Sequence, residues 1–208
     1  MKAKFITFEG PEGSGKSSVM KAVLEALQAK HISVMATREP GGIKISERIR
    51  KIILDVENME VDARTEALLF AASRRQHVIE KIRPALSNNT LVLCDRYIDS
   101  SLAYQGYGRK LGFETVLRIN EFAIEDLWPD LTIFIDLPPN IGLDRVFNNH
   151  KTRHVDRLDL ESINFHQRVY EGYLSLIKKY PNRIKVVDGN KEITKVIDDV
   201  LKIITANI

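Results

Sequence analysis

The segment GPEGSGKS at positions 10–17 decides the fold, because it joins an apolar run, Phe5–Phe8, to a stretch with helical periodicity. It matches the pattern G-x-x-x-x-G-K-[ST], whose glycines let successive backbone N–H groups converge on a phosphate at the start of a helix. Residues predicted to hold the phosphates of ATP or GTP are Gly10, Pro11, Glu12, Gly13, Ser14, Gly15, Lys16 and Ser17. Lys16 would place its charge between the β- and γ-phosphates, and Ser17 would offer a hydroxyl to Mg²⁺. Motors, switches and kinases share this loop, so it does not identify the reaction by itself.

Short apolar runs rich in β-branched residues alternate with longer amphipathic stretches along the chain. The runs are Phe5–Phe8, Val34–Thr37, Leu91–Cys94, Leu131–Leu137 and Ile184–Val187. This alternation is typical of a parallel sheet covered by helices on both faces. Polar, Gly or Pro residues follow each run, as expected where a buried strand surfaces into a ligand-binding loop. We therefore predict an α/β fold with a five-stranded parallel sheet, formed by residues 1–208 as one domain.

The longest predicted helix covers residues 64–86 and ends near Pro84. Apolar residues predicted to share one side of it are Leu68, Ala72, Ile79 and Ile82. Phe70 and Arg74 lie one turn apart on the same helix, so their side chains should project together.

Composition excludes several classes of protein. Lys and Arg together number 31 against 28 for Asp and Glu, an excess too small for the basic stripe of a nucleic-acid-binding protein. The single cysteine, Cys94, permits no internal disulfide, and its apolar neighbours predict a buried thiol. Residues 1–5 are too short and polar for a signal peptide, and no apolar window reaches the roughly 20 residues of a membrane span. We expect a cytoplasmic protein that binds neither nucleic acid nor membranes.

Charged residues stand at the ends of two predicted strands. Asp95 would lie beside the phosphate loop if the first and third strands are neighbours; there it could help hold Mg²⁺, although a turn or cap role fits equally well. Arg38 and Arg96, also at strand ends, should point into the crevice where ligands bind. Together with Arg50 and Arg74 they could converge on a doubly charged phosphate, although each could instead form a surface ion pair.

Further segments connect the chain to a known family. They are FEGPEGSGKS at 8–17, TREPGG at 37–42, EALLFAASRR at 66–75, DRYIDSSLAYQG at 95–106 and WPDLTIFID at 128–136. On these segments the chain resembles thymidylate kinase (dTMP kinase), bacterial type, over essentially its whole length. The resemblance implies a P-loop NTPase fold with a short lid at about 148–160, and a homodimer. It also implies transfer of the γ-phosphate of ATP to dTMP, giving dTDP and ADP in dTTP biosynthesis, with Mg²⁺ accompanying ATP.

The resemblance also implies which residues would contact the phosphate and sugar of dTMP. Arg38 and Arg96 would hold the phosphate, with Arg50 nearby. Tyr104 would lie against the sugar, where a ribose 2′-hydroxyl would clash. Glu12 would face the sugar 3′-hydroxyl or the transferring phosphate.

Other residues would recognise thymine by the same resemblance. Phe70 would stack on the ring, and Arg74 would donate a hydrogen bond to its exocyclic oxygen. Ser101 and Gln105 would also face the base, and Glu39 belongs to the same dTMP site. An aromatic face with a few fixed polar groups is how a pocket selects one base, although Phe70 could also be an ordinary core residue.

The catalytic residues implied by the family are Lys16, Arg96, Asp95, Glu12 and an arginine of the lid. Family members carry a catalytic arginine either in the phosphate loop or in the lid, and the loop at 10–17 has none. Arg153 is the first candidate and Arg157 the second. The segment Asp156–Asp159 resembles the family's D-R-hydrophobic-E sequence with Asp in place of Glu. A solvated basic loop remains the alternative reading of this region.

Two other functions fit parts of the sequence. A deoxynucleoside kinase shares the phosphate loop and an acid–Arg pair, but it needs a general base to deprotonate a sugar hydroxyl, and the arginine-rich acceptor side argues against it. A regulatory nucleotide switch would leave Phe70, Arg74 and Gln105 unexplained.

Overall fold

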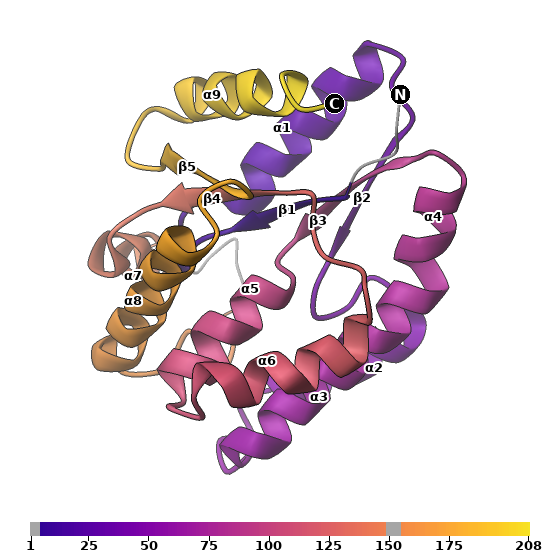
Figure 1. Cartoon of the computed structure of the whole chain (residues 1–208). Helices are drawn as coiled ribbons and strands as arrows, with labels where there is room; N and C mark the ends of the chain where they lie inside the picture. Colours follow the sequence, from indigo (N-terminus) through magenta and orange to yellow (C-terminus); the bar gives the residue numbers. More distant parts are fainter. Residues whose placement is uncertain (1–4, 149–154) are drawn as a thin grey trace.

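The computed structural model describes residues 5–148 and 155–208. Its centre is one parallel sheet with strand order β2-β3-β1-β4-β5 (Figure 1). The strands are β1 (Phe5–Glu9), β2 (Val34–Arg38), β3 (Leu91–Asp95), β4 (Leu131–Asp136) and β5 (Ile184–Asp188). Every predicted strand is confirmed to within one residue at each end, and so is the parallel arrangement.

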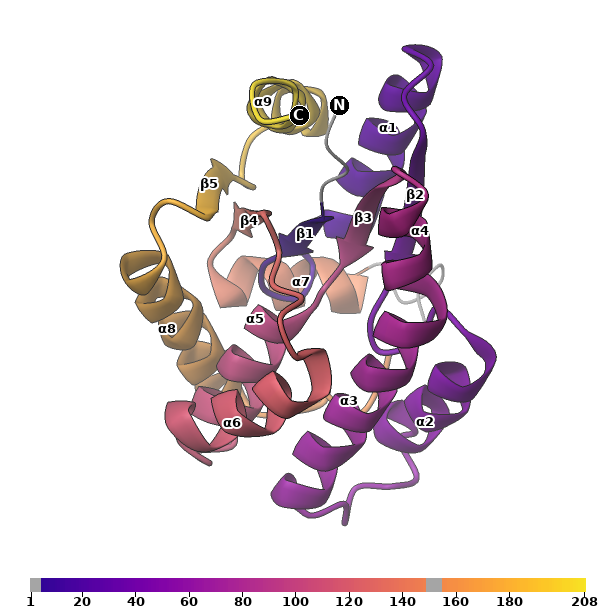
Figure 2. The same cartoon turned by 45° about the vertical axis from the view of Figure 1, so that its right-hand side comes forward.

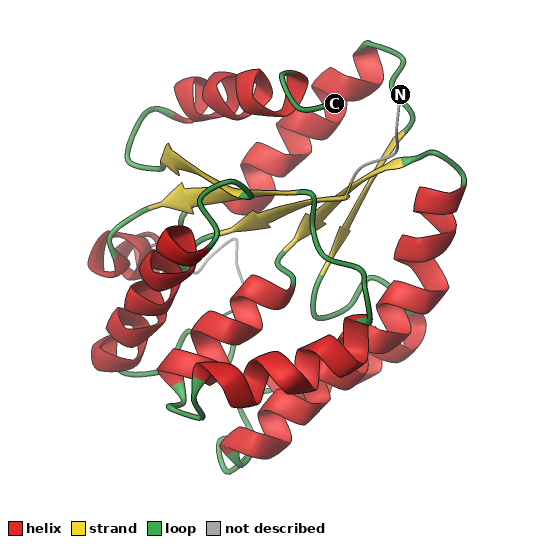
Figure 3. Ribbon diagram, viewed as in Figure 1, coloured by secondary structure: helices red, strands yellow, loops and turns green. Residues whose placement is uncertain are grey.

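Helices cover both faces of this sheet, as predicted (Figures 1 and 3). On one face lie α1 (Lys16–Ala29) and α9 (Ile193–Thr205). The other face carries most of the remaining helices, and α2 packs against α3 at its outer side (Figure 2). The remaining elements are α2 (Lys44–Leu54), α3 (Ala63–His77), η1 (Val78–Ile82), α4 (Arg83–Ser87), α5 (Ile98–Ser101), η2 (Leu102–Gly108), α6 (Phe113–Ile124), α7 (Pro139–Asn148) and α8 (Ile163–Lys179).

Alternation along the strands divides the core into two layers. Leu93, Ile133 and Ile135 point toward α1 and α9, whereas Val92 and Phe134 point toward the helices of the opposite face. Because successive side chains of a strand face opposite ways, a strand buried on both faces must be apolar throughout. Cys94 belongs to the second layer and its thiol is buried, as its neighbours predicted.

The helix predicted for residues 64–86 consists of three contiguous segments, α3, η1 and α4, of which the middle one, η1, is π-helical. The predicted span is confirmed to within one residue at each end, because the helical segments run from Ala63 to Ser87. Pro84 lies inside this span, in the first turn of α4 directly after the π-helical segment. Leu68, Ala72 and Ile79 share an exposed side, whereas Ile82 is buried in the core. The wider π-helical turn changes the phase of the helix and accounts for this rotation of Ile82.

The packing of α1 on the sheet can be tested with Leu27→Ala. Leu27 is fully buried between α1 and the sheet, so its truncation should lower the free energy of unfolding by about 2–5 kcal/mol. Urea denaturation followed by circular dichroism measures the change. Glu25→Ala, on the exposed side of the same helix, is the matched control and should stay within about 0.5 kcal/mol. Equal effects of the two variants would contradict the assigned core.

Candidate functional site

The carboxyl ends of β1, β2 and β3 meet at a cavity of about 600 Å³. Ligands bind at this edge in open parallel sheets, at the crevice between strand ends. Predicted site residues that line the cavity are Glu12, Gly13, Gly15, Lys16, Ser17, Arg38, Glu39, Arg50, Phe70, Arg74, Asp95, Arg96, Ser101, Tyr104 and Gln105. Gly10, Pro11 and Ser14 lie behind them in the phosphate loop, where Lys16 bonds to all three.

The phosphate loop depends on glycine at two close approaches. Gly10 has φ +148°, and a Cβ there would lie 2.5 Å from the carbonyl oxygen of Ile135. A Cβ on Gly13 would collide with the backbone of Gly142 in α7. The loop is therefore packed between β4 and α7, and no larger residue fits at either position without moving the backbone.

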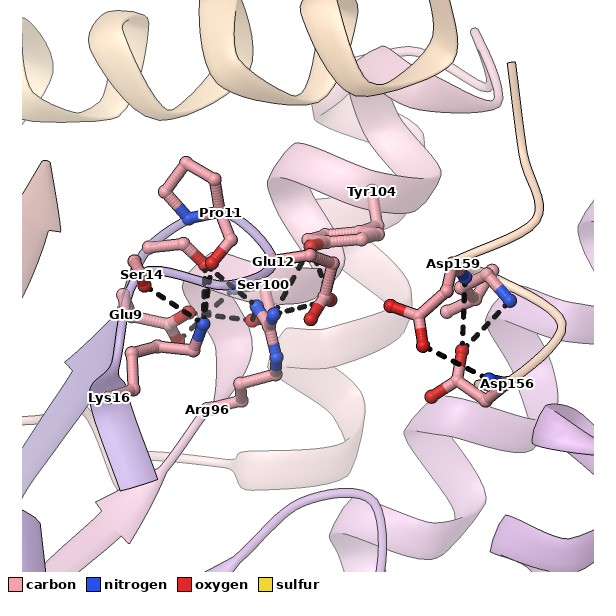
Figure 4. Close-up of polar contacts among 12 residues, drawn as sticks. Glu9, Pro11, Glu12, Ser14, Lys16, Arg96, Ser100, Tyr104, Asp156 and Asp159 are labelled. Atoms are coloured by element: carbon pink, nitrogen blue, oxygen red, sulfur yellow. Dashed lines mark hydrogen bonds and ion pairs between the residues drawn. The ribbon is translucent and has the colours of Figure 1, made fainter. Parts of the chain in front are cut away.

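The ammonium group of Lys16 spans this loop (Figure 4). Its Nζ donates hydrogen bonds to Gly10 O at 3.0 Å, Pro11 O at 2.7 Å and Ser14 Oγ at 3.2 Å. Burial, with a contribution from the charge of Arg96, lowers the pKa of Lys16 to about 8. A buried cation at the amino end of α1 is an electrostatic partner for a polyphosphate.

Ser17 and Asp95, which both line the cavity, form a pair of oxygen groups. Ser17 Oγ donates to Asp95 Oδ2 at 2.5 Å, which is possible because β1 and β3 are neighbours. A hydroxyl and a carboxylate are the hard oxygen ligands that Mg²⁺ takes in nucleotide sites, so this donor set fits the ion.

Arg96 follows β3 and has a left-handed backbone conformation with φ +66°. Its N–H donates to Phe8 O at 2.9 Å, which ties it to β1. Nη2 forms an ion pair with Glu12 Oε1 at 2.6 Å and also contacts the Tyr104 hydroxyl at 3.2 Å. Tyr104 in turn donates to Glu12 at 2.9 Å. Arg96, Glu12 and Tyr104 therefore form one wall of the cavity (Figure 4). Arg96 Nη1 donates to Gly10 O at 3.2 Å, the same oxygen that Lys16 Nζ contacts at 3.0 Å, so the two cations lie side by side.

The guanidinium group of Arg74, on α3, takes part in a buried hydrogen-bond network and is not positioned to bind a phosphate. Its Nε donates to Glu39 Oε2 at 2.7 Å, and its Nη1 bonds to Ser101 Oγ at 3.0 Å and to Asn120 Oδ1. Nη2 donates to Tyr97 O at 2.9 Å. These bonds engage most of the guanidinium donors and neutralise its charge with Glu39, so Arg74 suits recognition of a neutral base.

Glu39 is buried behind Arg74, and its second oxygen contacts His77 Nδ1 at 2.9 Å. His77 Nε2 in turn contacts Thr37 Oγ1 at 2.7 Å. Glu39 also reaches the cavity wall, yet its main contacts are with the side chains that hold Arg74.

The remaining predicted arginines lie at the outer side of the cavity. Arg38 forms an ion pair with Glu47 at 3.0 Å; the Arg38 side chain is 54% exposed and that of Glu47 38%. Arg50 donates to Pro40 O at 2.8 Å. Both line the cavity with Arg96, so the predicted gathering of these arginines around one space is reproduced, with Arg74 turned toward Glu39.

The predicted lid arginines have different positions. Arg153 lies outside the described residues. Arg157 is buried: its Nη2 forms an ion pair with Glu66 at 2.6 Å, and its Nε donates to Ile53 O at 2.8 Å. It does not line the cavity. The alternative of a solvated basic loop therefore does not hold for Arg157, which pairs with the buried carboxylate of Glu66 on α3.

Sequence reasoning missed several polar residues at the floor of the site. Glu9, Ser100 and Tyr173 bond to one another and, through Ser100 and Tyr173, to Arg96. Ser100 lies within the segment 95–106 that resembles the family, and this position was the only indication in the sequence that Ser100 could belong to the site. Tyr173 is 164 residues from Glu9, and its spacing in α8 is that of an ordinary core residue.

The fold and the loop define the class of protein first. A five-stranded parallel sheet with helices on both faces, and a glycine-rich loop leading from β1 into α1, form the α/β fold of the P-loop NTPases. The family model for thymidylate kinase matches residues 8–200.

Individual relatives extend over nearly the whole chain. A thymidylate kinase of Clostridium novyi (strain NT) is 53% identical over 199 residues, covering 96% of this chain and 97% of the relative. One of Ligilactobacillus salivarius (strain UCC118) is 55% identical over 205 residues, 98% of each protein. The crystal structure of a thymidylate kinase from Ehrlichia chaffeensis aligns with a TM-score of 0.80 at 32% identity, covering 99% of this chain and 100% of that one. The chain belongs to the thymidylate kinase family.

The structural role of Arg157 predicts the effect of Arg157→Met. Glu66 would remain buried with Arg109 and Gln105 as partners but without its shortest ion pair, so the free energy of unfolding should fall by about 3 kcal/mol. Urea denaturation measures the change, and Arg118→Met, at an exposed position on α6, is the control. Unchanged stability together with a large loss of turnover would instead give Arg157 a catalytic role.

Proposed function

We propose that this protein transfers the γ-phosphate of ATP to dTMP, giving dTDP and ADP in dTTP biosynthesis. The observation that carries the proposal is that the phosphate loop with Lys16 lines the same cavity as Arg96, Phe70 and Arg74. A triphosphate held by the loop and a nucleotide held by the arginines would meet in that space. Membership of the thymidylate kinase family supports the same reaction.

The acceptor side has the groups that a thymine nucleotide needs. Arg38, Arg50 and Arg96 would bind the acceptor phosphate, since guanidinium groups offer bidentate contacts to phosphate oxygens. Phe70 is half-buried at the cavity wall, where its ring can stack on a base. Arg74 and Ser101, with Gln105 one turn further along, would provide hydrogen bonds to the base edge, and Tyr104 would contact the sugar.

Transfer of the γ-phosphate depends more on aligning the two phosphates than on acid–base catalysis. The second pKa of a phosphate monoester is about 6, so the acceptor oxygen is already ionised at neutral pH and needs no strong general base. The barrier lies in bringing two anions together. Lys16 and Arg96, which both donate a hydrogen bond to Gly10 O, would offset that repulsion and the charge on the transferring group. Glu12 would hold Arg96 and the acceptor sugar, and Arg153 would complete the charge neutralisation from the lid.

Ser17 and Asp95 would hold Mg²⁺ with the help of phosphate oxygens. When bound, the ion would screen the β- and γ-phosphate charges.

We also propose a homodimer formed through α3, η1 and α6. Phe122 on α6 has 87% of its surface exposed, and Leu68 on α3 and Ile79 on η1 are 57% and 44% exposed. α3 and α6 pack together, so these residues lie on adjoining helices. Large exposed apolar side chains on neighbouring helices mark a surface that a second copy would cover.

We propose a single domain that acts in the cytoplasm without nucleic acid. Both core layers share the one sheet, which supports a single folding unit. Across residues 5–148 and 155–208, no helix combines the length and apolar character needed to cross a membrane.

The titration of Lys16 predicts how triphosphate binding depends on pH. Its pKa is lowered to about 8, so the ammonium loses its proton, and its attraction for phosphate, as the pH rises from 7 to 9. ATP affinity should therefore fall over this range, by up to about tenfold per pH unit above 8, and binding at pH 8 should take up protons. Calorimetric titrations in two buffers of different ionisation enthalpy measure both. Lys16→Met should bind weakly with no such slope; a wild-type affinity independent of pH would contradict the role of Lys16.

A coupled assay of ADP release tests the reaction itself. Purified protein is supplied with ATP, Mg²⁺ and, in turn, dTMP, dUMP, dCMP, dGMP, AMP and thymidine. We expect kcat/KM for dTMP to exceed that for dCMP, dGMP, AMP and thymidine by about 100-fold or more, because charged and polar groups of the cavity would recognise both the base and the phosphate. Turnover of thymidine but not dTMP would make the protein a nucleoside kinase, and ATP binding without any turnover would favour a nucleotide switch.

A further inference from the structure

Beneath Arg96 lies a buried carboxylate, Glu9, that the transfer chemistry does not use. It is the last residue of β1 and none of its surface is exposed. Oε1 accepts hydrogen bonds from the backbone N–H groups of Tyr97 at 2.8 Å and Ser100 at 3.3 Å. Oε2 accepts from the Ser100 hydroxyl at 2.6 Å and from the Tyr173 hydroxyl at 2.9 Å. Glu9 therefore binds hydrogen-bond donors from β3–α5 and from α8 at once.

The same two hydroxyls face Arg96 on their other side. Arg96 Nη1 donates to Ser100 Oγ and to Tyr173 Oη, both at 3.1 Å. A hydroxyl has one proton, and here the Glu9 carboxylate accepts it from each, so the lone pairs of both oxygens are directed at the guanidinium. Glu9 is thus connected to Arg96 by two hydroxyl bridges, in a buried setting where hydrogen bonds to charged groups are strong.

We propose that Glu9, Ser100 and Tyr173 form a buried relay, here called the Glu9 relay, that orients Arg96 for the acceptor phosphate. The relay contacts Nη1, which also donates to Gly10 O at 3.2 Å, while Nη2 is directed at Glu12 and Tyr104 on the cavity wall. Tyr173 is thereby a positioning residue, since its hydroxyl acts on a ligand only through Arg96. This inference rests on the proposed function, in which Arg96 binds the acceptor phosphate.

The ionisation of Glu9 should control the relay. Burial, reinforced by the charge of Asp99, raises the pKa of Glu9 to about 7, and Arg96 and the hydrogen bonds from Ser100 and Tyr97 act in the opposite direction. Other titratable groups facing it from the surrounding elements are Tyr173, Lys16, Arg183 and Cys94. When the pH falls through 7, protonated Glu9 no longer accepts from both hydroxyls, so Arg96 loses its orientation.

Tyr173→Phe removes one hydroxyl of the relay and leaves the ring. We expect the KM for dTMP to rise about tenfold, as a hydrogen bond to a charged group is lost, while the KM for ATP changes less than about twofold. The matched control is Tyr107→Phe: the Tyr107 hydroxyl also joins η2 to α8, bonding to Ser175 Oγ at 2.8 Å, but it does not contact Arg96. That control should leave both KM values unchanged. Ser100→Ala, which removes the other bridge, should repeat the effect on dTMP.

The pH profile separates positioning from a general structural effect. As the pH is lowered, kcat/KM for dTMP should begin to fall near pH 7 in the wild type and at a higher pH in Tyr173→Phe. The variant lacks the Tyr173 hydroxyl, whose hydrogen bond stabilises the ionised form of Glu9. Ionisation of dTMP itself, with a pKa of about 6, is the same for every variant. If Tyr173→Phe matched Tyr107→Phe in both KM and pH profile, or raised the KM for ATP and dTMP alike, the relay would be refuted.

A measurement without turnover keeps this inference distinct from the proposed function. The guanidinium signals of Arg96 in ¹⁵N NMR can be assigned by their absence in Arg96→Lys. We expect resolved, slowly exchanging Nη signals in the wild type and in Tyr107→Phe, and broadened signals in Tyr173→Phe. Identical Arg96 signals in all three proteins would overturn the relay even if dTMP is the substrate. Wild-type protein without dTMP turnover would overturn the proposed function, and the NMR result would still decide whether the relay orients Arg96.

Discussion

The parallel pairing of β1 with β3 is the constraint on which the site depends. In this register Phe8 pairs with Asp95, so β1 and β3 end next to each other at the same edge of the sheet. β1 continues into the phosphate loop, and β3 continues into Arg96, whose backbone N–H donates a hydrogen bond to Phe8 O. A left-handed conformation at an arginine costs about 1 kcal/mol or more, and this bond between the strands helps to maintain it. The donor and acceptor halves of the cavity are therefore aligned by backbone hydrogen bonds rather than by flexible side chains.

Buried charges around the cavity occur in compensated groups. In the cavity wall, Arg96 is paired with Glu12 and Arg74 with Glu39, and away from the lining Arg157 and Arg109 are paired with Glu66. Removing an ion from water is costly, and the cost is offset only where the partner and its hydrogen bonds are well placed. The result is a set of cations whose orientations are defined before a ligand arrives. Such preorganisation is what stabilisation of a charged transition state requires.

Much of the fold could be predicted from local sequence, because it depends on local signals. Apolar runs of β-branched residues indicated each strand, and the glycine-rich loop indicated the crossing from β1 to α1. Phe70 and Arg74, one helical turn apart, could likewise be expected to project together, and both line the cavity. Asp95 beside Ser17 followed from the assumption that β1 and β3 are neighbours, which the strand order confirms.

Residues brought together by packing could not be predicted in the same way. Tyr173 reaches Glu9 only because α8 packs across η2, and Gly142 meets Gly13 only because α7 lies against the phosphate loop. The family resemblance made Arg157 a candidate catalytic arginine of the lid, but the buried Glu66 on α3 binds it. The π-helical segment η1 changed the phase of a helix whose apolar spacing appeared regular. Each of these features depends on a contact between distant parts of the chain.

The most direct test of this account is a crystal structure of the protein with dTMP bound. We predict that the 5′-phosphate lies within hydrogen-bonding distance of Arg96, on the side of the cavity facing Lys16, with thymine stacked on Phe70 and its edge toward Arg74. A dTMP phosphate seated in the phosphate loop at 10–17, or a base remote from Phe70, would contradict the assignment of the two halves of the site.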